Sequence, residues 1–184
     1  MDKGKGMMRK ILQVIIVTVL LVTLPSQAKE SLEQSGDVLH LLLPATALAS
    51  TLIVEDDYQG TWQLVQSGVA SRLVVEVLKY SIEKDRPDGS GDDSFPSGHS
   101  ADTFAAATFI NQRYGWQYGV PSFAVASYVA YTRVASDQHH VEDVMAGAAI
   151  GILAGWYFTD PYKGISIVPI ASSDTYGVYI SGRF

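Results

Sequence analysis

The chain lacks cysteine altogether, and this absence excludes several kinds of site from its 184 residues. Disulfides, zinc centres built on thiolates, a cysteine nucleophile and an N-terminal lipoprotein anchor all require the missing residue. Charged residues are also scarce, at 17%, whereas hydrophobic residues make up 47%. A chain of this composition can bury a core, so disorder is excluded, and its length fits one domain with a short appendage.

An excess of positive charge is also missing. The formal net charge is −6, which argues against a nucleic-acid partner. Four of the thirteen Lys and Arg residues precede position 29, so the remainder holds nine cations against eighteen anions, a net charge of −9. Any cluster of cations in that remainder therefore stands out against an acidic background.

The N-terminus has the three parts of a secretory signal peptide. A leader with four cations precedes an apolar run over residues 11–24, and small residues then allow cleavage after Ala28. The apolar run of 14 residues is shorter than the roughly 20 that a spanning helix needs. The pattern predicts a signal peptide over residues 1–28 and export to the periplasm or the periplasmic face of a membrane. An uncleaved membrane anchor is the alternative.

Hydrophobic periodicity predicts an all-α domain over residues 29–164. The expected helices cover residues 38–54, 61–84, 100–113, 120–134 and 141–158. The last of them is rich in glycine and alanine, and small residues let helices approach closely. Alternating residues in the tail, 165–184, predict a short β-hairpin.

The predicted helices bear on whether the domain crosses a membrane. No predicted helix contains about 20 uninterrupted apolar residues, which favours a soluble or peripheral domain over one that crosses a membrane several times. Residues 38–54 could still be membrane-embedded, and membrane contact is compatible with the pattern. The polar residues 29–37 predict a mobile start before the first helix.

Two groups of residues have the chemistry to hold an anion. Lys79 and Arg86 are seven residues apart, so a helix would place both cations on one face, where their repulsion calls for an anion between them. Residues 96–99, Pro-Ser-Gly-His, precede a predicted helix whose first N–H groups favour an anion. Ser97 can donate its hydroxyl, and a protonated His99 can give its proton to a leaving group. Taken singly, these groups also fit a solvated helix end and an ordinary capped helix.

A third group consists of Arg133, His139 and Asp143. The i, i+4 spacing lets Asp143 accept the Nδ1–H of His139, which leaves Nε2 free as a nucleophile. Arg133 is a planar fork suited to two phosphoryl oxygens. A surface ion pair is the alternative interpretation. Together the three groups predict a site that holds a tetrahedral oxyanion between a nucleophilic and an acidic imidazole.

These groups resemble, in order and spacing, the three-part signature of the type 2 phosphatidic acid phosphatase superfamily: Lys79-x6-Arg86-Pro87, Pro96-Ser97-Gly98-His99 and Arg133-x5-His139-x3-Asp143. That superfamily includes bacterial acid phosphatases and vanadium haloperoxidases, and its fold is a helical bundle. The motifs span residues 79–143, and the resemblance extends over about residues 60–160. The family's third motif usually has Ser before the Arg, whereas this chain has Thr132, which keeps the hydroxyl.

The resemblance implies a metal-independent phosphatase, with no cofactor, that hydrolyses phosphomonoesters or pyrophosphates and is expected to act on lipid-linked ones. It makes His139 the nucleophile that forms a phosphohistidine, Asp143 its orienting partner and His99 the group that protonates the leaving oxygen. The phosphate-binding residues that it implies are Lys79, Arg86, Ser97, Gly98 and Arg133.

The same motifs also allow other interpretations. A vanadate-dependent haloperoxidase would share the same anion cage, and a metal- or anion-binding envelope protein would need no catalysis. Residues 137–143 contain two His and three acidic residues that could form a metal cluster, although the nearby arginines would repel a cation. His40 is interpreted as a core or interface histidine, and the acidic residues over 85–93 as loop and solvation chemistry.

Overall fold

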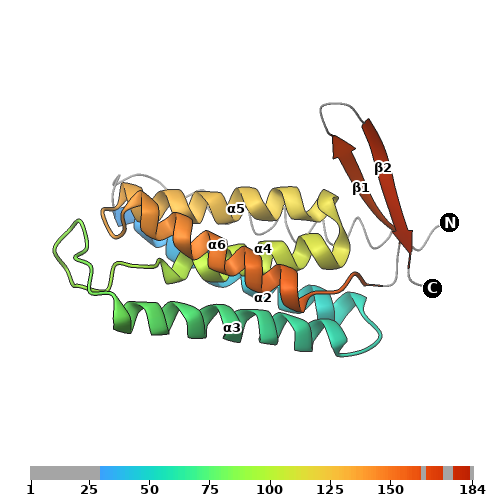
Figure 1. The fold of residues 1–184 in the computed structure, drawn as a ribbon, viewed down its shortest axis with the longest axis horizontal. Coiled ribbons are helices and arrows are strands. Elements are labelled where there is room, and N and C mark those ends of the chain that lie inside the picture. Colours follow the sequence, from blue (N-terminus) through green and yellow to red (C-terminus); the bar gives the residue numbers. More distant parts are fainter. Residues whose placement is uncertain (1–29, 163–164, 172–175, 183–184) are drawn as a thin grey trace.

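The protein is described by a computed structural model that covers residues 30–162, 165–171 and 176–182. The predicted signal peptide therefore lies outside the described residues. The helices that the structure describes are α2 (Glu30–Val54), α3 (Gln59–Ser81), α4 (Gly98–Tyr114), α5 (Trp116–Ala135) and α6 (Val141–Phe158). They run side by side as an elongated bundle (Figure 1), which confirms the predicted all-α class.

Helix α4 is the centre of the bundle and contacts α2, α3, α5 and α6. Its sequence explains this position, because small and apolar residues cover most of its surface, and Ala101, Ala107 and Phe109 are fully buried. Gly115 ends the helix at a φ of 99°, a conformation that favours glycine, and the chain enters α5 at once. The central helix therefore starts at the predicted Ser-Gly-His segment and carries it into the middle of one end of the bundle.

Helix α6 approaches α4 through a row of glycines, as the small residues in its sequence predicted. Gly147, Gly151 and Gly155 are buried one turn apart. A Cβ at Gly147 would overlap the main-chain oxygen of Ser97, and one at Gly151 would overlap that of Ala101. This close approach fixes the start of α6 against the start of α4, and both starts carry predicted site residues.

Helix α2 begins earlier than the sequence predicted. The polar residues 30–37 are helical rather than a mobile start. They are held because Arg133 NH2 donates to the Glu33 main-chain oxygen at 2.7 Å and Gln138 Nε2 donates to the Glu33 carboxylate at 2.6 Å. The first turns of α2 are thus fixed by contacts with the end of α5 and the residues after it.

The tail contains two strands, β1 (Ile165–Ala171) and β2 (Tyr176–Gly182). They pair antiparallel with Ile165 opposite Gly182, within the stretch where alternating residues predicted a hairpin. In Figure 1 the pair stands at the opposite end of the bundle from the loop that joins α3 to α4. The strands are therefore remote from the predicted site.

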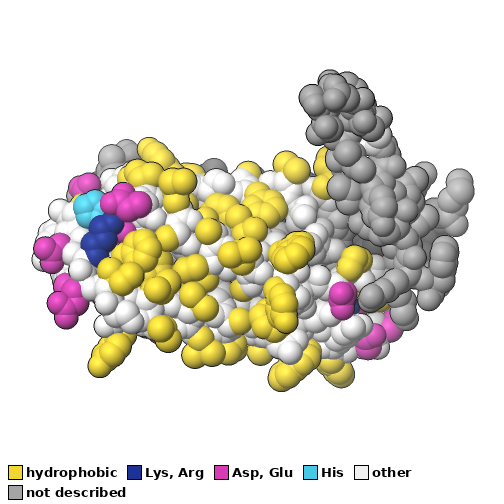
Figure 2. Space-filling view, in the orientation of Figure 1, with side chains coloured by type: hydrophobic (Ala, Val, Ile, Leu, Met, Phe, Trp, Pro, Cys, Tyr) yellow, Lys and Arg dark blue, Asp and Glu magenta, His cyan; other side chains and the backbone are white. Residues whose placement is uncertain are grey.

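Large apolar side chains remain exposed along the length of the bundle, while charges gather at its two ends (Figure 2). Helices α2 and α6 are long and apolar enough to cross a membrane, with mean hydropathies of 1.7 and 1.3. Only 22% and 28% of their most apolar windows are buried, which is low for the core helices of a soluble protein. This surface fits membrane contact, which the predicted soluble or peripheral domain includes in its peripheral form.

Candidate active site

Lys79 and Arg86 meet on one carboxylate, that of Asp93. Arg86 donates from Nε to Oδ1 at 2.7 Å and from NH2 to Oδ2 at 3.1 Å. Lys79 Nζ lies 3.5 Å from Oδ2 and also donates to the Asp93 main-chain oxygen. The predicted common helical face is wrong, because α3 ends at Ser81 and Arg86 lies in the following loop. The two cations converge because the loop folds back, not because a helix aligns them.

The Asp93 carboxylate is strongly stabilised in its charged form. Its hydrogen bonds with Arg86 lower its pKa to about 2, and the charges of Lys79 and Arg86 act in the same direction. The pKa of Arg86 is raised in turn by its hydrogen bonds with Asp93. An anion therefore already occupies the place between the cations where the sequence predicted one.

Arg133 and His99 share a second carboxylate, that of Asp37 in α2. Arg133 NH1 donates to Asp37 Oδ1 at 2.8 Å, and His99 Nε2 lies 3.1 Å from the same oxygen. The Arg133 side chain is 1% exposed, and its Nε donates to the Thr132 hydroxyl at 3.3 Å. Thr132 thus keeps a polar contact in the position where the family usually has serine.

The His139 ring is held in one tautomer by a main-chain carbonyl. Its Nδ1 lies 2.7 Å from the Ser94 oxygen, and a carbonyl can only accept. Nδ1 therefore carries the proton, and Nε2 of the neutral ring has a free lone pair. The predicted direct bond with Asp143 is not formed, because Oδ2 of that residue lies 3.9 Å from Nδ1, beyond hydrogen-bond distance.

Asp143 is fully buried and orients His139 only through other residues. Its Oδ2 accepts from the Ser94 hydroxyl at 2.5 Å and from the His140 main-chain N–H at 2.8 Å, and its Oδ1 accepts from Lys84 Nζ at 2.5 Å. The lysine compensates the buried charge. Because Asp143 fixes Ser94, and Ser94 holds His139, the carboxylate orients the imidazole indirectly.

The His139 side chain is only 4% exposed, and its surroundings keep it uncharged. Burial lowers its pKa to about 4, with further lowering by the charges of Arg86 and Lys79, against the opposing effects of the Ser94 carbonyl and Asp143. The ring is consequently neutral at physiological pH. The charges of Arg86 and Lys79 thus disfavour the charged form of the ring.

The Ser97-Gly98 segment forms the start of α4. Ser97 is the N-cap, and its hydroxyl oxygen accepts from the Ser100 main-chain N–H at 3.4 Å. Its own N–H donates to the Asp143 main-chain oxygen at 2.9 Å. Gly98 is in the first turn, where helical N–H groups lack partners within the helix. The segment thus links Asp143 to a helix start that favours an anion.

All eight predicted site residues lie at the bundle end that carries the loop between α3 and α4. The contacts described above connect them, together with bonds from the His139 N–H to the Arg133 carbonyl at 3.1 Å and from Arg86 NH1 to Gln138 at 3.5 Å. Sequence reasoning missed four participants: Asp37, Lys84, Asp93 and Ser94. Only Asp93 had been noted, as a loop residue, and no spacing marked the others.

The sequence and the fold of the chain are similar to those of known proteins. The family model described as PAP2 superfamily matches residues 60–163. Lipid A 1-phosphatase of Porphyromonas gingivalis is 43% identical over 86 residues, which is 45% of this chain and 19% of that protein. Lipid A 4'-phosphatase of Helicobacter pylori is 29% identical over 143 residues, 72% of this chain and 71% of that protein.

A solved structure shares the fold. The crystal structure of LpxE from Aquifex aeolicus superimposes with a TM-score of 0.60 at 21% sequence identity, covering 77% of this chain and 92% of that one. The helical bundle is therefore common to both chains, whereas the two-stranded tail follows the segment that the family model matches.

Proposed function

Because this chain belongs to the PAP2 superfamily, we propose that it is a phosphatase that removes phosphate from a lipid-linked substrate through His139. The observation that carries the proposal is the state of this imidazole. The Ser94 carbonyl holds the proton on Nδ1, burial keeps the ring neutral, and Nε2 is left as a nucleophile near two cations. The phosphatase names of the relatives support the same reaction class.

In the first step, Nε2 of His139 attacks phosphorus, so that an N–P bond forms while the bond to the leaving oxygen breaks. His99 gives its proton to that oxygen. Burial and the charges of His40 and Arg133 lower the pKa of the His99 ring to about 4, and the negative charge of the bound phosphoryl group opposes these effects and favours the protonated ring. Lys79, Arg86 and Arg133 bind the phosphoryl oxygens, and the Ser97 hydroxyl and Gly98 N–H add neutral donors. The phosphoryl group takes the places of the Asp93 and Asp37 carboxylates on these cations.

In the second step, water attacks phosphorus and the N–P bond breaks. His99 takes one proton from the water, phosphate leaves, and His139 returns to its neutral form. Asp143 takes no part in bond changes. It keeps Ser94 in place and thereby fixes the tautomer of His139 through both steps. The protein's own cations neutralise the charge of the transferred group, so the proposed reaction needs no metal.

A lipid-linked substrate is supported by the surface of the bundle. Exposed apolar side chains surround its middle, and the proposed site lies at one charged end. A bilayer placed around that middle would set the site at the level of lipid headgroups. The leader pattern of the sequence favours the periplasmic face for this end.

The test is phosphate release by the protein purified in nonionic detergent. We expect release from alkyl phosphates, lipid phosphates or prenyl pyrophosphates, unaffected by EDTA and requiring neither halide nor peroxide.

The substitution His139→Ala should abolish phosphate release and should also abolish an acid-labile phosphoryl-enzyme trapped with radioactive substrate. His140→Asn is the matched control, because it removes the neighbouring ring but keeps a side chain that can cap α6. Activity that survives His139→Ala would refute the proposed nucleophile, and loss in EDTA would refute metal independence.

A further inference from the structure

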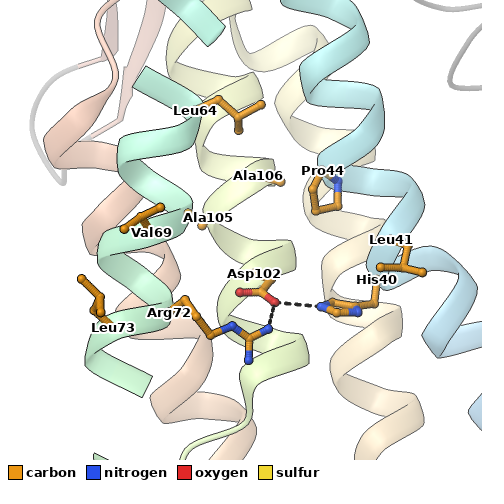
Figure 3. A pocket seen from close by; sticks show the side chains of 11 residues that line it. His40, Leu41, Pro44, Leu64, Val69, Arg72, Leu73, Asp102, Ala105 and Ala106 are labelled. Atoms are coloured by element: carbon orange, nitrogen blue, oxygen red, sulfur yellow. Dashed lines mark hydrogen bonds and ion pairs between the residues drawn. The ribbon is translucent and has the colours of Figure 1, made fainter. Parts of the chain in front are cut away.

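A pocket of about 540 Å³ lies between α2, α3 and α4 (Figure 3). Its volume is in the range of small-molecule binding sites. Eleven residues line it, and eight of them are apolar or small. The other three are His40, Arg72 and Asp102, which Figure 3 shows grouped together. The pocket therefore has an apolar body and one polar end.

Asp102 organises the polar end. Its Oδ2 lies 2.8 Å from His40 Nε2 and also accepts from the Arg72 guanidinium (Figure 3). The Asp102 and His40 side chains are mostly buried, whereas that of Arg72 is 42% exposed. The cluster thus joins three helices around one carboxylate and leaves part of a guanidinium accessible. None of its members belongs to the three-part signature.

This polar end adjoins the proposed site. The ring of His40 lies 4.1 Å from the ring of His99, centroid to centroid. The Arg72 guanidinium lies against Gly98, where an added Cβ would come within 2.6 Å of NH1. Arg72 also precedes Lys79 by seven residues in α3, so both cations lie on one face of that helix. The pocket therefore begins beside the residues proposed to hold phosphate.

We propose that this pocket binds an apolar chain of the substrate, with the linkage between chain and phosphate at the Arg72–Asp102–His40 cluster. The inference rests on the proposed function and specifies its substrate class. A lipid phosphate needs an apolar space that starts next to a cation cage, and the pocket meets both conditions. Val69 and Leu73 line it and are 53% and 61% exposed, so a chain can enter sideways from surrounding lipid.

Gly68 provides a clean way to fill the pocket. It lines the pocket, and a Cβ built on it meets no atom within 4 Å. Gly68→Leu and Gly68→Phe therefore add volume without displacing the backbone, and both residues are better helix formers than glycine. Val77→Phe is the matched control, because Val77 lies on the same helix, is 62% exposed and does not line the pocket.

The measurement is the kcat/KM for hexadecyl phosphate divided by that for butyl phosphate, in nonionic detergent micelles. This ratio does not change when a variant merely contains less active enzyme. We expect it to fall about tenfold in Gly68→Phe, by less in Gly68→Leu, and not at all in Val77→Phe.

A wild-type ratio in Gly68→Phe would overturn the pocket assignment while leaving the phosphatase activity intact. A wild-type protein that releases phosphate from neither ester, and from neither lipid phosphates nor prenyl pyrophosphates, would instead overturn the proposed function. The two failures are thus distinguished by the wild-type measurement alone.

Discussion

Asp93 and Asp37 hold the cations that are proposed to bind phosphate. Asp93 pairs with Lys79 and Arg86, and Asp37 pairs with Arg133. An incoming phosphate must replace these carboxylates, so part of its binding free energy is offset by the contacts that it breaks. Affinity for anions is consequently lower than the number of cations alone would indicate.

Asp93→Asn is expected to tighten inhibition by inorganic phosphate two- to fivefold, because an amide competes less well for the two cations. The effect is small because the Asp93 side chain is 51% exposed and solvent screens its pairs. Asp92→Asn is the control, because it removes the same charge one residue away. An inhibition constant unchanged in Asp93→Asn, or changed equally in both variants, would contradict the competition.

The neutral state of His139 predicts the acid limb of the pH profile. Protonation would remove the Nε2 lone pair, so kcat/KM should fall as pH drops through about 4 rather than through the usual 6.5 of histidine. The free energy of unfolding should also fall on acidification. Between pH 6.5 and about 4 the unfolded chain binds the proton more readily than the folded chain, so acidification in this range favours unfolding. An acid limb near 6.5 in the pH dependence of kcat/KM that does not move with the pKa of the phosphoester used would refute the buried neutral ring.

The structure brings together the site residues that the sequence predicted, but their partners could not be predicted. The spacing of Arg133, His139 and Asp143 indicated the imidazole and its carboxylate. The group that bonds Nδ1 is the carbonyl of Ser94, and every residue has a carbonyl, so no side-chain pattern reveals it. Asp37 is 96 residues from Arg133, and no sequence pattern indicates that the two side chains are in contact.

At the level of elements, apolar periodicity located every helix that the structure describes but misplaced several ends. Helix α2 starts at Glu30 because long-range contacts hold its polar turns, and periodicity cannot sense such contacts. Helix α3 stops at Ser81, three residues before the expected end at Lys84. Ends depend on a few local bonds, whereas the body of a helix depends on a repeated pattern.

The glycine row of α6 predicts a strong response to added volume. Gly147→Leu should push α6 away from the Ser97 carbonyl, lower the stability by about 1–3 kcal/mol and reduce phosphate release, because Asp143 moves with the helix. Thermal unfolding in detergent measures the stability. Gly68→Ala is the control, because its Cβ meets no atom, and it should be neutral or slightly stabilising. A wild-type unfolding temperature in Gly147→Leu would contradict the close approach.

At the scale of the whole molecule, several polar residues of helix α3 are buried and several of its apolar residues are exposed. Gln63, Ser67 and Ser71 are buried, while Val69 and Leu73 are exposed. A bundle of this kind needs no uninterrupted apolar run to lie in lipid, since its polar residues face other helices. The sequence criterion for single spanning helices therefore does not apply to a bundle whose helices carry their polar residues on inner faces.

Membrane residence can be tested without the N-terminal apolar run. When residues 1–28 are replaced by an unrelated cleavable signal peptide, we expect the protein to stay in the membrane pellet after an alkaline carbonate wash and to be released by detergent. The exposed apolar faces of α2 and α6 give the reason. A soluble periplasmic protein is the control. Recovery of the chain in the carbonate supernatant would refute residence in the bilayer.

The bond between Arg133 and the Glu33 carbonyl joins positions 100 residues apart. Synthesis proceeds from the N-terminus, so the beginning of α2 exists well before its partners have left the ribosome. The proposed site can therefore assemble only after α5 has been synthesised. A nascent chain that lacks α5 is expected to be inactive, and substrate turnover begins only when α5 packs against α2.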